Sequence, residues 1–250
     1  MMYALDGSPL DGSVYRDVVD LAGRAPSWLD SLISAWSTLG LGLFAVLMIV
    51  VWWRARHIGP RDALVALAVP LVVVLAYALN DGLKMLVRED RPCQSLHVST
   101  LEACPAPGDW SFPSNHTAIA AAAAVALFVV SRRVGRIALV AAAAMGASRV
   151  WVGAHYPHDV VAGFVVGALV AYLAMIPLSR HPGALTRRLE STPLRPLLQA
   201  SSAPSGSSTS SGSSTSSASS GSSASSASPG PSAGPSAGQD PAPERVDSRS

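Results

Sequence analysis

The chain has 250 residues, of which 49% are hydrophobic and only 14% are charged, and its formal net charge is +2 at pH 7. This composition is too apolar for an ordinary soluble domain and indicates a membrane protein. The net positive charge is weak, and the sequence has no basic stretch interleaved with aromatic residues. We therefore expect no nucleic-acid binding.

The N-terminal segment, residues 1–33, is expected outside the hydrocarbon core. Its early residues include Asp6, Asp11, Asp17 and Asp20, where a cleavable signal peptide would carry basic residues, so we expect no such signal. Charged and apolar positions alternate irregularly over 14–33, which predicts a short helix lying in the membrane interface.

Five apolar segments follow, each near the 17 to 25 residues that cross a hydrocarbon core as a helix. They span residues 34–53, 63–82, 114–131, 137–154 and 160–178. The third is rich in alanine and only modestly apolar. The predicted fold class is therefore all-α, a polytopic membrane helix bundle of about five spans, with its core over residues 34–180.

The C-terminal part has two sections. Residues 181–199 form a basic juxtamembrane segment, and residues 200–250 are almost entirely Ser, Ala, Gly and Pro. Such a tail cannot bury enough apolar surface to offset its ordering entropy, so it is predicted to be disordered. We favour an inert extension over a partner-binding or phosphorylated tail.

Arginine placement predicts the orientation of the spans. Arginines gather in three connections, at 54–61, 132–136 and 180–188, and short cationic loops stay in the cytoplasm. The tail is then cytoplasmic, while the N-terminus, the loop over 83–113 and the turn over 155–159 face outward. The outer loop also holds cations, which count against this orientation.

Two cysteines, Cys93 and Cys104, lie in that outer loop. An oxidising compartment would allow them to form a disulfide that closes the loop. Two free thiols are an equal alternative, because only the predicted compartment supports the bond.

The first polar cluster is in "KMLVREDRP". Lys84, Arg88 and Arg91 are spaced by four and three residues, so they share one helical face if the second span continues past the membrane. An ordinary basic cap on a membrane helix is the alternative interpretation.

The second cluster, "FPSNHT", places Ser114, Asn115 and His116 at the start of the third span. A helix N-terminus presents unpaired N–H groups and partial positive charge, which together suit an anion. Ser and Asn are also ordinary N-caps, so the cluster alone decides nothing.

The third cluster, "SRVWVGAHYPHD", joins the fourth and fifth spans and contains Ser148, Arg149, His155 and Asp159. A carboxylate four residues after a histidine can accept one ring N–H and leave the other nitrogen free as a nucleophile or base. A structural contact is the alternative. All three clusters fall on one side of the membrane, and together they suit phosphoryl transfer.

The order Lys-x6-Arg-Pro, Pro-Ser-Asn-His and Ser-Arg-x5-His-x3-Asp resembles the type 2 phosphatidic acid phosphatase (PAP2) superfamily over residues 34–178. The resemblance implies that His155 attacks phosphorus and forms a phosphohistidine, that Asp159 orients it, and that His116 protonates the leaving oxygen. The family commonly has glycine at position 115, so Asn115 is a departure, and its backbone N–H is a further expected phosphate donor. The implied phosphate-binding side chains are Lys84, Arg91, Ser114 and Arg149.

No metal or other cofactor is expected, because the cations neutralise the phosphate. A metal site built from His97, His116, His155 and His158 is a minor alternative, and His158 and Arg88 are otherwise expected to be surface groups.

Within the family, "SFPSNHT" and "SRVWVGAHYPHDVVAG" look most like bacterial undecaprenyl-diphosphatases of the bacitracin-resistance type, in the plasma membrane with an outward-facing site. The implied substrate is a polyprenyl diphosphate held in the bilayer, cleaved to the monophosphate plus phosphate. Phosphatidylglycerophosphate, phosphatidic acid and polyprenyl-phosphate sugars remain alternatives, as does a non-enzymatic transporter or scaffold. The sequence does not indicate an oligomeric state.

Overall fold

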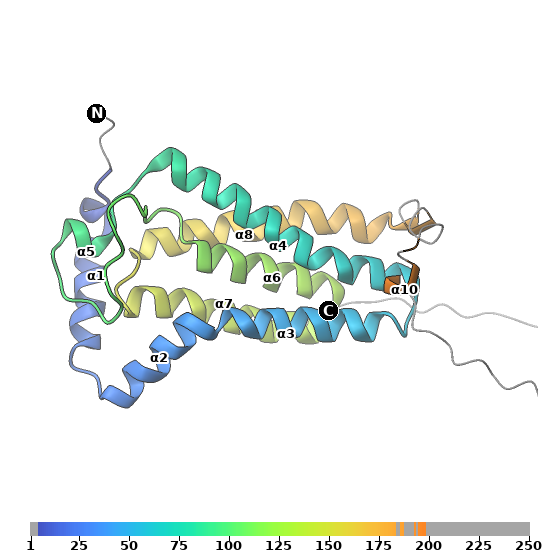
Figure 1. The fold of residues 1–250 in the computed structure, drawn as a ribbon, viewed down its shortest axis with the longest axis horizontal. Helices are drawn as coiled ribbons and strands as arrows, with labels where there is room; N and C mark the ends of the chain where they lie inside the picture. Colours follow the sequence, from blue (N-terminus) through green and yellow to red (C-terminus); the bar gives the residue numbers. More distant parts are fainter. Residues whose placement is uncertain (1–4, 184–185, 188–192, 194, 199–250) are drawn as a thin grey trace, which may run out of the picture. The chain divides into compact units, whose positions relative to one another are not determined.

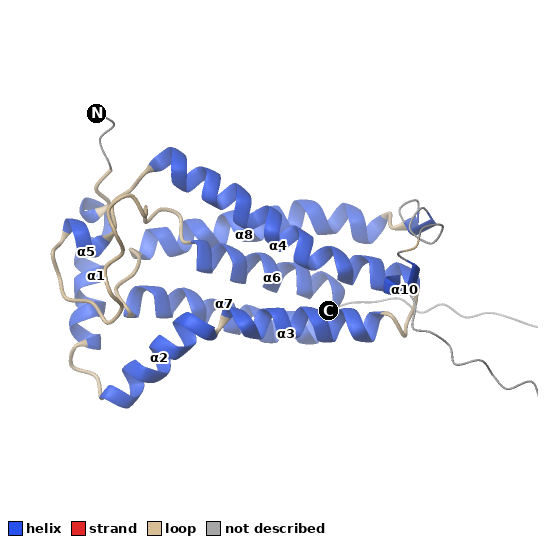
Figure 2. Cartoon of the chain, viewed as in Figure 1, coloured by secondary structure: helices blue, strands red, loops and turns tan. Residues whose placement is uncertain are grey.

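The structure is a computed structural model that describes residues 5–183, 186–187, 193 and 195–198. These residues form helices joined by loops, with one isolated parallel bridge between Leu5 and Glu89 (Figure 2). The predicted all-α class is confirmed. The predicted disordered tail, 200–250, lies outside the described residues.

Five helices run side by side as a bundle (Figure 1). They are α3 (Leu41–Ala55), α4 (Pro60–Val87), α6 (Asn115–Val130), α7 (Arg132–Trp151) and α8 (Pro157–Arg180). The helix α6 is at the centre and packs against the other four. A run of alanines over 120–124 is buried in it, because small side chains let the surrounding helices approach closely.

Two glycines bring α8 against α6. A Cβ at Gly163 would overlap the carbonyl oxygen of Ser114, and one at Gly167 would overlap that of Ala118. This small-xxx-small spacing is typical of close helix pairs in membranes. It places the start of α8 directly beside the start of α6, where two of the predicted polar clusters lie.

Among the described residues, three helices, α4, α7 and α8, are long and apolar enough to cross a membrane. The helices α2 (Ser27–Leu39) and α3 make a fourth candidate, bent by 51°. The fifth predicted span is α6, whose 16 residues extend about 24 Å at 1.5 Å per residue, short of a hydrocarbon core of about 30 Å. Because its neighbours enclose α6, the thickness of the lipid does not set its length.

The segment predicted as a short helix over 14–33 is helical, but it is divided between two helices. The chain forms α1 (Ser8–Ala22), turns, and begins α2 at Ser27 after the extended residue Pro26. Proline has no N–H to continue a helix, so it separates the two. The helix α1 packs on the ends of α7 and α8, where the hydroxyl of the buried Tyr15 donates a 2.9 Å hydrogen bond to the Gly153 carbonyl.

The two ends of the bundle differ in their chemistry. The α3–α4 turn, the α6–α7 junction and the end of α8 carry arginines and lie at one end (Figure 1). The end of α4, the start of α6, the end of α7 and the start of α8 meet at the other end. All three predicted polar clusters lie at this second end.

Candidate active site

The second end of the bundle contains a cavity of about 200 Å³. Its lining includes three of the predicted site residues, Arg91, His116 and Arg149, together with Glu102 and Asp109. The Cys93–Cys104 disulfide forms part of the same wall. Cations, a histidine and carboxylates thus converge on one small space.

His155 and Asp159 lie next to this cavity and are almost completely buried, at 2% and 0% exposure. The His155 Nδ1 atom is 3.3 Å from Asp159 Oδ2. The same carboxylate oxygen accepts a 2.9 Å hydrogen bond from the Tyr156 N–H, which fixes the carboxylate at the start of α8. The predicted histidine–aspartate pair is therefore present as a contact.

Ser111 decides which ring nitrogen of His155 carries the proton. Its hydroxyl donates to Asp159 Oδ2, and its oxygen lies 3.4 Å from His155 Nδ1. The Ser111 hydroxyl uses its only proton in the hydrogen bond to Asp159. The Ser111 oxygen and Asp159 Oδ2 can therefore only accept a hydrogen bond from Nδ1. The proton belongs on Nδ1, and Nε2 keeps a lone pair.

The surroundings also keep His155 neutral. Burial lowers the pKa of His155 well below its ordinary value of 6.5, and the positive charges of Arg91, Lys84 and Arg149 lower this pKa further. A neutral imidazole with Nε2 unprotonated is the form that can act as a nucleophile or base.

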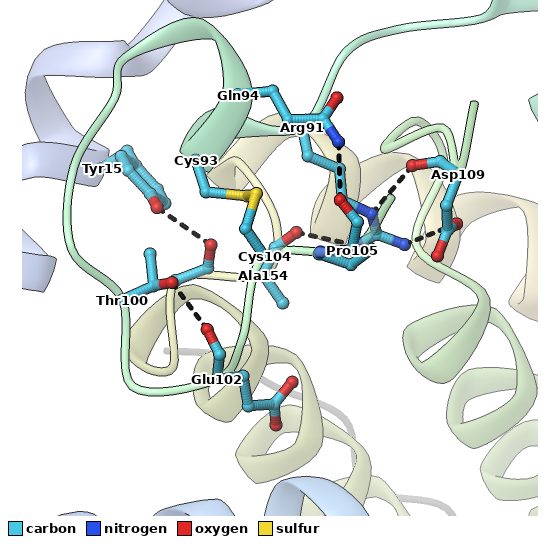
Figure 3. Close-up of a disulfide and its surroundings, with 11 residues drawn as sticks. Tyr15, Arg91, Cys93, Gln94, Thr100, Glu102, Cys104, Pro105, Asp109 and Ala154 are labelled. Atoms are coloured by element: carbon cyan, nitrogen blue, oxygen red, sulfur yellow. Dashed lines mark hydrogen bonds and ion pairs between the residues drawn. A yellow bond between two sulfur atoms is a disulfide. The ribbon is translucent and has the colours of Figure 1, made fainter. Parts of the chain in front are cut away.

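Arg91 is fixed by three hydrogen bonds. It donates to the Asp109 carbonyl at 2.9 Å, to the Asp109 carboxylate at 2.9 Å and to the Ala154 carbonyl at 3.0 Å (Figure 3). The ion pair lowers the pKa of Asp109, although burial acts in the opposite direction. These bonds aim the guanidinium into the loop that carries His155.

The predicted helical face of Lys84, Arg88 and Arg91 was wrong. The helix α4 ends at Val87, and Arg88 takes a left-handed conformation with φ of 54°. Arg91 therefore reaches the cavity from the following loop and not from α4. Lys84 remains on α4, where it is buried.

Arg149, at the end of α7, contacts two other segments. Its Nη1 donates to Glu102 Oε1 at 3.0 Å and to the hydroxyl of Ser37 on α2. The Nε atom of Arg149 is buried and has no hydrogen-bond partner among the described residues. The Nε donor of this guanidinium is thus not used by an acceptor among the described residues.

The start of α6 has the predicted form. Ser114 is its buried N-cap, yet its side chain makes no capping hydrogen bond, so the first N–H groups of α6 are not satisfied by it. The side chain of Asn115 accepts from Asn80 at 2.7 Å and donates to Asp81 at 3.2 Å, both on α4. Asn115 lies within the helix, so its departure from glycine needs no positive φ.

His158 is not an ordinary surface group. Its Nδ1 lies 2.8 Å from Asp11 of α1, and its Nε2 lies 2.9 Å from Glu89. Glu89, His158 and Asp159 are close enough to share a metal ion, but a ring that donates from both nitrogens has no lone pair for a metal. The contacts describe an ion network beside Asp159, in which burial raises the pKa of Glu89.

The Cys93–Cys104 disulfide decides between the two alternatives for these cysteines (Figure 3). It lies in the loop between α4 and α6, whose only helix is α5 (Pro92–Ser95). Gln94, next to Cys93, donates to the Pro105 carbonyl at 2.8 Å. These links hold Glu102 and Asp109 over the cavity.

The sequence did not point to four side chains of this site: Ser37, Glu102, Asp109 and Ser111. Each lies far along the chain from its partner, so no local spacing predicts the contact. Ser111 directly precedes the "FPSNHT" cluster, which is the one signal that could have drawn attention to it.

A helical membrane bundle that gathers a buried histidine–aspartate pair, cations and a helix N-terminus at one end defines a membrane enzyme that acts on phosphate groups. Residues 63–181 match the family model described as the PAP2 superfamily. The bacitracin transport permease protein BcrC of Bacillus licheniformis is 31% identical over 66% of this chain and 78% of its own length. The chain belongs to the PAP2 superfamily, and it is a multi-pass membrane lipid phosphatase.

Two further relatives and one solved structure are also similar to this chain. Undecaprenyl-diphosphatase BcrC of Bacillus subtilis is 29% identical over 59% of this chain and 74% of its own length. A decaprenylphosphoryl-5-phosphoribose phosphatase of Mycobacterium tuberculosis is 36% identical over 38% of this chain and 51% of its own. Among solved structures, the PAP2-type phosphatidylglycerolphosphate phosphatase of Bacillus subtilis has a TM-score of 0.50 at 26% identity, covering 65% of this chain and 83% of its own.

Proposed function

We propose that the protein hydrolyses a polyprenyl diphosphate, undecaprenyl or decaprenyl, to the monophosphate and inorganic phosphate, and so recycles a cell-wall carrier lipid. The observation that carries the proposal is the pair of His155 and Asp159, buried beside a cavity that also holds Arg91, His116 and Arg149. Two relatives bear the name undecaprenyl-diphosphatase, from Bacillus subtilis and Sulfolobus acidocaldarius, which supports this substrate over the alternatives.

The first chemical step is an attack by Nε2 of His155 on the terminal phosphorus. A nitrogen–phosphorus bond forms, and the bond to the bridging oxygen breaks. His116 gives a proton to that oxygen, which leaves as the lipid monophosphate. Asp159 accepts the Nδ1 proton in a hydrogen bond and stabilises the positive charge that develops on the ring.

The second step returns the enzyme to its starting form. His116, now without its proton, takes one from a water molecule, and the water oxygen attacks the phosphohistidine. The nitrogen–phosphorus bond breaks, inorganic phosphate leaves, and His155 regains its lone pair. Each group is thereby restored after one cycle.

Charge neutralisation is assigned to the protein's own groups, so the mechanism needs no metal ion. The phosphate oxygens are bound by the buried cations and by the α6 N-terminus, where N–H groups and partial positive charge favour an anion. The residues assigned to this role are Lys84, Arg91, Ser114, Asn115 through its backbone, and Arg149.

We place the site on the extracytoplasmic face of a bacterial plasma membrane. Two observations support this side. The arginine-rich connections lie at the opposite end of the bundle, and cationic loops stay in the cytoplasm. The Cys93–Cys104 disulfide lies at the site end, and disulfides persist in oxidising compartments.

The test is phosphate release by the detergent-purified protein, with chelator present and with His155→Ala as the control. The substrates are a polyprenyl diphosphate, phosphatidylglycerophosphate, phosphatidic acid, a lipid A 1-phosphate and a decaprenylphosphoryl-phosphoribose phosphate. We expect chelator-resistant release that is fastest from the polyprenyl diphosphate and absent in the variant. A preference for any other substrate would overturn the proposed pathway, and loss of activity with chelator would overturn the metal-free mechanism.

A further inference from the structure

We propose that the hydrocarbon chain of the substrate lies in an apolar groove between α2 and α7 that ends beside Arg149. The inference deepens the proposed function, because it assumes a lipid whose phosphate enters the cavity beside His155. It also assigns a place to the part of the substrate that phosphate-binding residues cannot recognise.

The groove consists of two adjoining apolar cavities of about 430 and 560 Å³. Both are lined by Trp36 of α2 and Ala144 of α7, so one continues into the other along α7. The remaining lining is apolar apart from Ser148 at one end and Arg136 at the other. The side chains that form its walls are Leu32, Ile33, Trp36, Ala144, Ala147 and Trp151.

The bend between α2 and α3 produces the groove. The two helices meet at 51°, so α2 diverges from α7 while α3 stays in the bundle (Figure 1). A Cβ at Gly40, which joins them, would lie 2.7 Å from Cε of Met145 on α7. Glycine therefore permits the α2–α3 junction to lie close to α7. From this point α2 turns away from α7, and the small alanines of α7 leave the space between the two helices open.

The groove and the phosphate cavity are lined by neighbouring residues on both walls. On α7, Ser148 lines the groove and Arg149 lines the cavity. On α2, Trp36 lines the groove, and the hydroxyl of Ser37 accepts from Arg149. A lipid whose first methylene groups pass this point has its phosphate at Arg149 and its chain between α2 and α7.

The dimensions fit a hydrocarbon chain. Along α7 the lining extends from Arg136 to Trp151, which is about 22 Å at 1.5 Å per residue and most of a hydrocarbon core. An apolar groove of this length has no partners for the polar groups of a headgroup or a peptide backbone. Arg136 lies at the end of the groove that is far from Arg149. Its long side chain can carry the charge to the opposite membrane interface.

The test fills the groove and compares long and short substrates. Ala144→Phe and Val140→Phe place a ring in the groove away from its phosphate end, and Ala143→Phe is the matched control, because Ala143 is exposed on α7 outside the lining. Each protein is assayed with a long-chain polyprenyl diphosphate and with a diphosphate carrying a short prenyl chain. Displacing about two methylene groups corresponds to a rise of about tenfold in KM.

We expect the groove variants to raise KM for the long chain about tenfold, and the control to leave it unchanged. The short-chain substrate should keep its kcat and KM in all variants, which shows that the proteins are folded. Equal effects on both substrates, or no effect on either, would overturn the inference. If the protein prefers another lipid phosphate, the same comparison with long and short forms of that lipid tests the groove, so the two proposals fail separately.

A diazirine-bearing polyprenyl phosphate gives a second measurement that does not depend on turnover. We expect photolabelling on peptides from α2 and α7, reduced by Ala144→Phe and kept in Ala143→Phe. Labelling confined to α4 or α8 would place the chain elsewhere, as would labelling that the variant does not change. Crosslinks between two copies of the chain across these helices would assign the groove to a dimer and overturn the proposal.

Discussion

Arg149 Nη1 is bonded to Glu102 Oε1 at 3.0 Å, so a cation assigned to the substrate phosphate is already paired with a carboxylate. Arg91 has the equivalent relationship with Asp109 at 2.9 Å. Both carboxylates belong to the loop between α4 and α6. A phosphate that enters the cavity competes with them for the two guanidinium groups.

Replacement of Glu102 by Gln should therefore tighten the binding of phosphate analogues. The amide keeps the size of the side chain but removes the competing negative charge. The analogue used is orthovanadate. We expect its inhibition constant to fall about fivefold, which is the change in affinity that one charge-assisted hydrogen bond contributes at a partly exposed site. Asp90→Asn removes a carboxylate from the same loop that is bonded to neither arginine, and should change nothing. An equal fall in both variants would show only a general effect of charge.

Removal of the Ser111 hydroxyl should lower kcat more than it changes KM. Ser111 donates to Asp159 and also faces Nδ1 of His155, so it acts through these groups and not on the substrate. In Ser111→Ala we expect kcat to fall about tenfold, which corresponds to the loss of one hydrogen bond to a charged group. We also expect a change in the apparent pKa on the acid side of the pH–rate profile. Ser179→Ala, at the far end of α8, is the control. A change in KM alone would assign Ser111 to substrate binding.

The proposed phosphohistidine can be trapped directly. With a substrate carrying ³²P in its terminal phosphate, rapid quenching in base should leave label on the protein, because phosphohistidine survives base and is lost in acid. His155→Ala should show no label and no turnover. In Asp159→Asn we expect kcat to fall by at least about 10²-fold. Label on a different residue would contradict the assignment of the nucleophile.

The helices and the motif clusters were predictable from the sequence because both depend on local pattern. Apolar runs of span length predicted the bundle, and Pro113 followed by Ser114 predicted the start of α6. The spacing of His155 and Asp159 predicted their contact. In each case the residues concerned are near neighbours along the chain.

The predictions failed where tertiary contacts decide the structure. The continuous face of Lys84 and Arg91 assumed that α4 extends further, but the backbone turns at Arg88 and returns Arg91 through the loop. The pairing of Ser37 with Arg149 spans 112 residues, and no local spacing encodes it. The apolar groove between α2 and α7 depends on the angle between α2 and α3, which the apolar pattern does not specify.

Stability should depend on pH through His155. Its pKa is lowered in the folded protein, chiefly by burial, so below about pH 6.5 the unfolded chain binds a proton that the folded one does not. Stability is therefore lost as the pH falls from 7 to 5. His155→Asn lacks this titration, so its melting temperature should fall less than that of the parent protein over this range. Parallel curves would contradict a neutral, buried His155.

Reduction of the Cys93–Cys104 disulfide should affect stability and phosphate binding together. The bond closes a loop of 11-residue separation, and removal of such a link costs about 2–4 kcal/mol. The same loop carries Glu102 and Asp109, which pair with Arg149 and Arg91. Its loosening should also strengthen vanadate inhibition, because the two carboxylates then compete less for the arginines. The comparison is the parent protein with Cys93→Ser/Cys104→Ser, measured by melting temperature and by vanadate inhibition. A lower melting temperature with unchanged inhibition would show that the disulfide stabilises the loop without positioning the arginines.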